Sequence, residues 1–183
     1  LNPFMKKKCE NAFSNRFGSY FAGKRIAIDT NNQSFVRMSR ARKTTIQNLN
    51  LFLENIDENE LIRNWLMEML RFAFTFLDLG IYPIFVFDGS YVKSKSKAHE
   101  KRKKTRDKIK KDISDMLIEG RSKDPLEITS TEVHNLRKKI LQDIHVKKDH
   151  YTLLFSVLSS MGIPCLQATG EAEKLCSMLC KEG

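Results

Sequence analysis

Two aspartates each follow a short apolar run, a placement that could hold a divalent cation. Asp29 ends the run "KRIAID" and Asp88 ends "IYPIFVFD", with Gly89 next. A third run, "IPCLQA", is followed by Glu171 and Glu173. Carboxylates gathered at one place repel one another and lose hydration unless cations neutralise them, and hard oxygen ligands select Mg²⁺ or Mn²⁺. Two such ions about 4 Å apart can activate a water and stabilise the leaving oxygen of a phosphodiester.

Each acid also has a structural interpretation. Asp-Gly is a common turn pair, so Asp88 could belong to a turn, and an acid favours a helix N-terminus electrostatically. Residues two apart in a helix point about 200° away from each other, so Glu171 and Glu173 can share a metal site only if Glu171 lies in an irregular turn after Gly170. These interpretations stay open for single residues. Three strand ends that carry acids favour the metal site for the set.

The elements that must position these acids alternate between strand and helix. Residues 24–29 and 82–88 are typical of buried strands, and residues 59–80 between them carry apolar side chains at helical spacing up to Gly80. A helix over 149–162, a strand over 163–168 and a helix from 169 repeat the unit. This order predicts an α/β fold with a mostly parallel central sheet, whose strand ends place the acids at one edge. Residues 39–58 have no clear assignment and are predicted to be an excursion.

A strongly basic segment interrupts the alternation. Eleven of the nineteen residues from 93 to 111 are Lys or Arg, and two weakly amphipathic helices are expected over 107–120 and 131–148. The net charge is +10 and the pI is near 9.5, which favours nucleic acid as the partner, ahead of an anionic membrane surface. A solvated helix face is the simpler interpretation. The basic segment comes just after Asp88, however, and this position favours a cationic surface that binds a phosphate backbone. Such binding should weaken as the salt concentration rises.

Three stretches of the sequence resemble the flap endonuclease family of structure-specific 5′ nucleases. They are "SYFAGKRIAID", "GIYPIFVFDG" and "LLFSVLSSMGIPCLQATGEAEKLCSMLCKEG", of which "MGIP" followed by "GEAE" is the most specific. The resemblance implies a PIN-like α/β fold with flanking helices and a basic helical cap insertion. It also implies two Mg²⁺ ions, for which Mn²⁺ can substitute, and cutting of DNA near single-strand/double-strand junctions in replication or repair.

The same resemblance implies roles for individual residues. Lys95 and Arg102 would be the basic pair at the base of the helical gateway, steering the scissile phosphate and stabilising its charge. The metal-cluster carboxylates would be Asp29, Asp88, Glu171 and Glu173, which together with Lys95 and Arg102 form the expected catalytic set.

Further positions would contact the DNA. Phe35 would stack on a base next to the scissile bond, with a place in the core as the equal alternative. Arg42 would touch the substrate. In the basic run the expected contacts are Lys101, Lys103 and Lys104.

The chain also departs from the family. Further metal-binding aspartates and a helical DNA-clamping motif would lie beyond residue 183, "SY" replaces Pro-Pro after "FDG", and the N-terminal "LNPFMKKKCENAF" replaces a Met-Gly start. We therefore expect one incomplete nuclease domain: an N-terminal nuclease region over 1–92, a basic gateway or cap over 93–148, and the start of an internal nuclease region over 149–183.

The expected partner is branched or 5′-flap DNA, with a sliding clamp allowed through a missing C-terminal region. No window is apolar enough to predict a membrane span, so we expect a soluble, intracellular monomer with no membrane partner, nuclear if eukaryotic and otherwise at the site of DNA replication. Two other functions stay open. One is a non-catalytic DNA-binding module that keeps the fold, and the other is a PIN-type ribonuclease, which would prefer single-stranded RNA.

Overall fold

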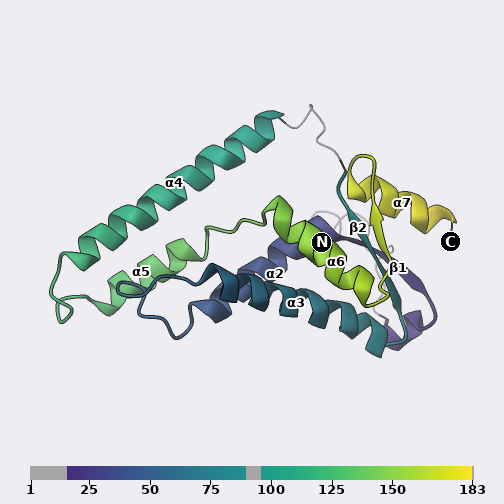
Figure 1. Ribbon diagram of the computed structural model, residues 1–183, viewed down its shortest axis with the longest axis horizontal. Coiled ribbons are helices and arrows are strands. Elements are labelled where there is room, and N and C mark those ends of the chain that lie inside the picture. The colour runs from purple at the N-terminus through teal and green to yellow at the C-terminus, as the bar shows by residue number, and fades with distance from the viewer. Residues whose placement is uncertain (1–15, 90–95, 183) are drawn as a thin grey trace.

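A parallel sheet of three strands in the order β1-β2-β3 organises the fold (Figure 1). The computed structural model describes residues 16–89 and 96–182. Strand β1 spans Arg25–Asp29, β2 Tyr82–Phe87 and β3 Cys165–Gln167. The predicted α/β class and parallel sheet are therefore confirmed.

Helices connect and cover the strands, and Gly80 and Gly162 end two of them at the predicted positions. Both glycines have positive φ, 71° and 75°, a conformation that glycine adopts without the steric cost of a Cβ. The helical segments are η2 (Gly18–Phe21), α2 (Thr30–Thr45), α3 (Glu58–Asp78), α4 (Ser96–Arg121), α5 (Ser130–Ile140), α6 (Lys148–Ser160) and α7 (Ala172–Glu182).

Both faces of the sheet are covered, which explains why the strands are apolar at nearly every position. Alternate side chains of a strand point to opposite faces. Ile28, Phe85 and Phe87 join the main core, whereas Ala27 and Val86 pack with residues of α7 in a separate cluster. Helix α7 thus lies on one face, and α2, α3 and α6 lie on the other (Figure 1).

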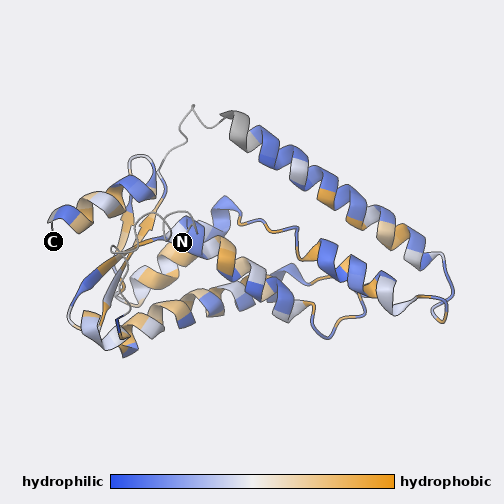
Figure 2. Cartoon of the chain, turned by 180° about the vertical axis from the view of Figure 1, so that it is seen from behind, coloured by the Kyte–Doolittle hydropathy of each residue, from blue (hydrophilic) through white to orange (hydrophobic). Residues whose placement is uncertain are grey.

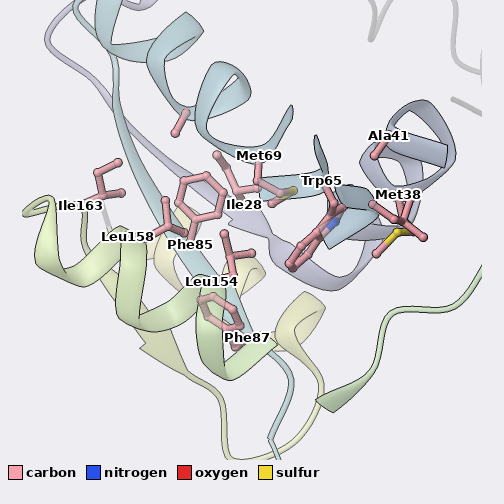
Figure 3. Packing of buried hydrophobic residues seen from close by; sticks show 12 residues of the cluster. Ile28, Met38, Ala41, Trp65, Met69, Phe85, Phe87, Leu154, Leu158 and Ile163 are labelled. Atoms are coloured by element: carbon pink, nitrogen blue, oxygen red, sulfur yellow. The ribbon is translucent and has the colours of Figure 1, made fainter. Parts of the chain in front are cut away.

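The main core is built around Trp65 and the inward face of α6 (Figure 3). Trp65, Phe85, Leu154 and Leu158 are each 0% exposed. The indole Nε1 of Trp65 donates a hydrogen bond to the backbone carbonyl of Ser34 at 3.1 Å, so the buried ring leaves no unpaired donor. This contact ties α3 to α2, the helix that follows Asp29.

Helix α4 extends away from the sheet and is mostly hydrophilic (Figure 2). Its C-terminal half packs against α5 and the loop before α3, through a smaller cluster that contains Phe52 and Leu136. Asp112 on α4 accepts a hydrogen bond from Nζ of Lys139 on α5 at 2.6 Å. The basic helix is thus anchored at its far end.

Two sequence-based boundaries were wrong. Helix α2 continues to Thr45, because Met38, Ala41 and Thr45 form a buried face, so only the latter part of 39–58 is an excursion. The helix expected over 131–148 ends at Ile140, and residues 141–147 cross non-helically to α6. Tertiary contacts hold this crossing, since Asp143 pairs with Arg42 of α2 and the Nδ1 of His145 lies 2.8 Å from Nη1 of Arg106 on α4.

No helix within 16–89 or 96–182 has the length and hydropathy needed to cross a membrane.

The packing of α6 predicts a contrast between two neighbouring leucines. Leu154→Ala should lower the free energy of unfolding by about 2 to 5 kcal/mol, because it opens a cavity in the main core. Leu153 is 41% exposed, so Leu153→Ala should change it by no more than about 0.5 kcal/mol. Urea unfolding followed by circular dichroism measures both. Equal losses in the two variants would contradict the assigned face of α6.

Candidate active site

Asp29 and Asp88 lie at the carboxyl ends of neighbouring strands. Asp29 is the last residue of β1 and pairs in register with Val86, and Asp88 directly follows β2. By strand alternation, position 29 shares a face with Ala27, and position 88 shares a face with Val86. Ala27 and Val86 both pack against α7. The two aspartates therefore lie at one edge of the sheet, as predicted, and strand alternation directs both positions toward the α7 face.

Asp88 accepts hydrogen bonds from residues of three elements. Its Oδ1 accepts a hydrogen bond from the backbone N–H of Ala172 at 2.8 Å, and its Oδ2 accepts one from Nδ2 of Asn31 at 2.5 Å. The backbone carbonyl of Asp88 accepts a third from Nε2 of Gln167. Asp88 thus caps the start of α7, a favourable place for a negative charge. Each carboxylate oxygen still keeps a lone pair for another ligand.

Asp29 caps the helix that follows it. Its Oδ1 accepts a hydrogen bond from the backbone N–H of Asn32 at 3.1 Å, at the N-terminus of α2. The capping interpretation of both aspartates is therefore confirmed. Capping occupies only part of either carboxylate, so it does not compete with metal binding.

The two aspartate charges affect their neighbours. Burial, followed by the charges of Asp88 and Asp29, raises the pKa of Tyr151 to about 12. Burial, followed by the charge of Asp29, raises the pKa of the Cys176 thiol. Tyr151 lies on α6 and Cys176 on α7. The negative potential at this edge thus reaches both faces of the sheet.

The two glutamates differ in backbone setting. Glu171 precedes α7, in the non-helical turn after Gly170, and Glu173 lies exposed in the first turn of the helix. This is the irregular turn that a shared site requires.

The donors in the described segments fit a divalent cation in chemistry, since all are hard carboxylate oxygens. Across those segments, however, no three His, Cys, Asp or Glu side chains are arranged to hold a metal ion. The four-carboxylate cluster stays a prediction.

Gly89 allows a close approach behind Asp88. A Cβ built at Gly89 would lie 2.1 Å from the backbone oxygen of Ala168 and 2.6 Å from the carbonyl carbon of Thr169. The N–H of Gly89 donates to the carbonyl of Gly170 at 2.7 Å. The absence of a side chain at Gly89 therefore lets the β2 end and the turn before α7 pack together.

A cavity of about 920 Å³ opens beside Asp88, between the end of the sheet and α6. Sequence reasoning singled out Asp88 and Gly89 but missed the polar and aromatic side chains that line the rest of it. Asn31 and Gln167 follow or end predicted strands and could have been suspected, whereas the inward side of α6 depends on packing. The lining includes Asn31, Asp88, Lys148, Tyr151, Phe155 and Gln167.

The two expected DNA contacts on α2, Phe35 and Arg42, differ in exposure to solvent. Phe35 is 52% exposed, which excludes the core alternative for its ring and leaves it able to stack. Arg42 is 8% exposed, and its Nη1 lies 3.8 Å from Oδ2 of Asp143. That position gives Arg42 a structural role in holding the crossing over 141–147 to α2, and the expected substrate contact stays a prediction.

The expected contacts on the basic helix are solvent-facing. Arg102 is exposed in the first half of α4, and Lys104 pairs with Glu100 one turn earlier at 3.0 Å. Lys95 lies outside the described residues. The remaining expected contacts, Lys101 and Lys103, are exposed on the same helix.

Comparison with known families identifies the domain. Residues 4–109 match the XPG N-terminal domain. The chain belongs to the XPG N-terminal domain family. This domain contains both aspartates and the beginning of α4, and the match confirms the suspected relationship to the structure-specific nucleases.

Several curated relatives of this XPG domain are nucleases. Flap endonuclease 1 of Cryptosporidium muris is 33% identical over 115 residues, covering 63% of this chain and 22% of the relative. Flap endonuclease 1 of Cryptosporidium parvum is 30% identical over 183 residues, covering 100% of this chain and 34% of the relative. A probable RAD2-like endonuclease, 369L, of Invertebrate iridescent virus 6 is 25% identical, covering 100% of this chain and 49% of the relative. The chain spans half or less of the length of these relatives.

The fold of the XPG domain also resembles a solved structure. The catalytic core of Rad2 in complex with DNA substrate has a TM-score of 0.52 and 20% sequence identity, covering 97% of this chain and 42% of that one. The likeness confirms the α/β architecture.

The close approach at Gly89 predicts a contrast between two glycines. Gly89→Ala should lower the free energy of unfolding by about 1 to 3 kcal/mol, because the new methyl group meets backbone atoms that cannot move aside. Gly170→Ala has nothing within 4 Å of its Cβ and should cost less than about 1 kcal/mol. Thermal unfolding followed by circular dichroism measures the difference. A Gly89→Ala protein as stable as wild type would contradict the packing described for this edge.

Proposed function

We propose that this chain carries the N-terminal part of a metal-dependent, structure-specific 5′ nuclease of flap endonuclease type. Its substrate would be branched or 5′-flap DNA, cut near a single-strand/double-strand junction during replication or repair. The observation that carries the proposal is the convergence of Asp29, Asp88 and the start of α7 at one sheet edge, beside a cavity. Membership of the XPG N-terminal domain family supports it.

Divalent ions, Mg²⁺ or Mn²⁺, would be held by Asp29 and Asp88, with Glu171 and Glu173 as further ligands. Such ions supply positive charge that polarises a phosphodiester and lowers the pKa of a water nucleophile. The protein's own contribution is placement. The strand ends fix both aspartates, and Asn31 and the Ala172 N–H orient the Asp88 carboxylate.

The basic helix would bind the phosphate backbone. Arg102 and Lys95 would steer the scissile phosphate, while Lys101, Lys103 and Lys104 would contact neighbouring phosphates. The gateway assigned to 93–148 and the stacking role of Phe35 belong to the same proposal. Such a nuclease would act inside the cell, in the nucleus of a eukaryote, and a sliding clamp would be a further partner.

A non-catalytic DNA-binding module is the second candidate. The exposed lysines of α4 favour it, because they would bind a phosphate backbone without any metal ion. It shares the fold and the basic helix with the first candidate, so only cutting separates the two.

Cleavage of an end-labelled 5′-flap DNA in Mg²⁺ tests the proposal. Asp88→Ala should lower the cutting rate by more than about 100-fold. Loss of a residue that only hydrogen-bonds to a metal ligand already lowers metal affinity or activity by about 10- to 100-fold. Asp88→Asn should lose cutting equally while it keeps a capping side chain for α7, which separates lost charge from lost structure. The acidic control is Asp78→Ala. Asp78 is the last residue of α3, near the start of β2 and away from the end that carries Asp88, so this variant should cut like wild type.

Junction cutting that disappears with EDTA and in both Asp88 variants would establish the nuclease. Salt-sensitive binding without cutting, alike in wild type and variants, would favour the binding module. Preferential cutting of single-stranded RNA would contradict both candidates in favour of a ribonuclease.

The salt dependence of duplex binding tests the basic helix. Replacing Lys101, Lys103 and Lys104 by Gln should make the slope of log affinity against log salt shallower by about 2 to 3, because each lost phosphate contact removes about 0.9. A control with the same loss of charge replaces Arg16, Lys24 and Arg25, which lie before β1 or at its amino end, and should leave the slope nearly unchanged. Equal slopes in the two triple variants would mean that the net charge, and not α4, binds the DNA.

A further inference from the structure

Lys148 places an uncompensated positive charge at the mouth of the cavity beside Asp88. It is the first residue of α6, it is exposed, and it lines the cavity. Within the described segments its ammonium group has no carboxylate partner at ion-pair distance. The preceding residue, Lys147, lies 3.6 Å from Glu58 and does not line the cavity. Two adjacent lysines therefore differ in what they can bind.

Aromatic rings form a wall of the same cavity. Tyr151 and Phe155 lie three and seven residues after Lys148, so all three share one face of α6. The ring of Phe155 packs 5.2 Å from that of Phe87, which fixes it against the end of β2. Tyr151 is partly buried beside it and is held by the main core. A rigid aromatic wall next to a free cation suits a ligand with a planar ring and a phosphate.

The cavity also lies in line with other expected contacts. Asn31 lines it and Phe35 follows one turn later on the same face of α2. Asp88 lines the same cavity. A volume of about 920 Å³ lies within the range of roughly 300 to 1,000 Å³ that is usual for small-ligand sites, and it is large enough for a nucleotide.

We propose that this cavity binds one nucleotide of the DNA strand next to the cleavage point, with Lys148 on its phosphate and Tyr151 stacked on its base. The inference rests on the proposed function, because the strand reaches the cavity only if DNA binds at the Asp88 edge. It adds a second strand contact on the α6 side, separate from the basic helix α4.

Binding of a fluorescein-labelled single-stranded oligothymidylate, measured by anisotropy in EDTA, tests the subsite without any need for metal or cutting. Lys148→Gln should weaken binding about three- to tenfold and make the salt slope shallower by about 0.7, as expected for one lost phosphate contact on a single strand. Lys147→Gln removes the same charge one residue away and should leave the slope as in wild type.

The stacking contact has its own pair of variants. Tyr151→Leu should weaken binding about tenfold, whereas Tyr151→Phe keeps the ring and should bind within about twofold of wild type. Circular dichroism checks that both variants are folded. If Tyr151→Leu does not fold, the Lys148 and Lys147 pair decides the question alone.

Failure of the subsite is distinguishable from failure of the proposed function. A wild-type protein that binds and cuts flap DNA, with Lys148→Gln matching Lys147→Gln in affinity and slope, would overturn the subsite alone. A wild-type protein that neither binds the oligonucleotide nor cuts the flap would overturn both.

Discussion

The site depends on the double role of the Asp88 carboxylate. One oxygen binds the first amide of α7 and the other binds Asn31, which lies just after β1. The group thereby connects the end of the central strand to a helix on each face of the sheet. This contact adds to the backbone hydrogen bond from Gly89 to Gly170 in holding the turn that carries Glu171 to the end of β2.

Negative charge is sustained here because the surroundings favour it. The N-termini of α2 and α7 both face the aspartates with unpaired backbone amides, and each aspartate accepts one. Capping and metal binding are compatible uses of a carboxylate, because a cap takes only part of its accepting capacity. The buried strand β2 holds the Asp88 carboxylate in place, because Val86 and Phe87 are buried on its two faces.

The positive charge of the protein is arranged in a different way. Helix α4 extends from the sheet and packs mainly through its C-terminal half, and most of its lysines are exposed to solvent. The lysine at the start of α6 is instead placed by the core, since Leu154 and Leu158 fix the orientation of that helix. A strand of DNA at this edge of the sheet would meet two cationic surfaces: the extended one of helix α4, and Lys148, whose helix is held by the core.

Sequence alone determined the elements and their order, because apolar periodicity and glycine stops are local signals. It predicted Asp29 and Asp88 at one edge, since parallel strands end together, and the pairing of β1 with β2 places them there. Tertiary structure decided what local patterns do not encode. Burial turned Arg42 into a partner of Asp143, contacts with α2 and α4 ended the helix expected over 131–148, and packing of α6 brought Lys148 and Tyr151 to Asp88. Which side of a helix meets a site depends on residues far away in the chain, and for that reason only the folded structure shows it.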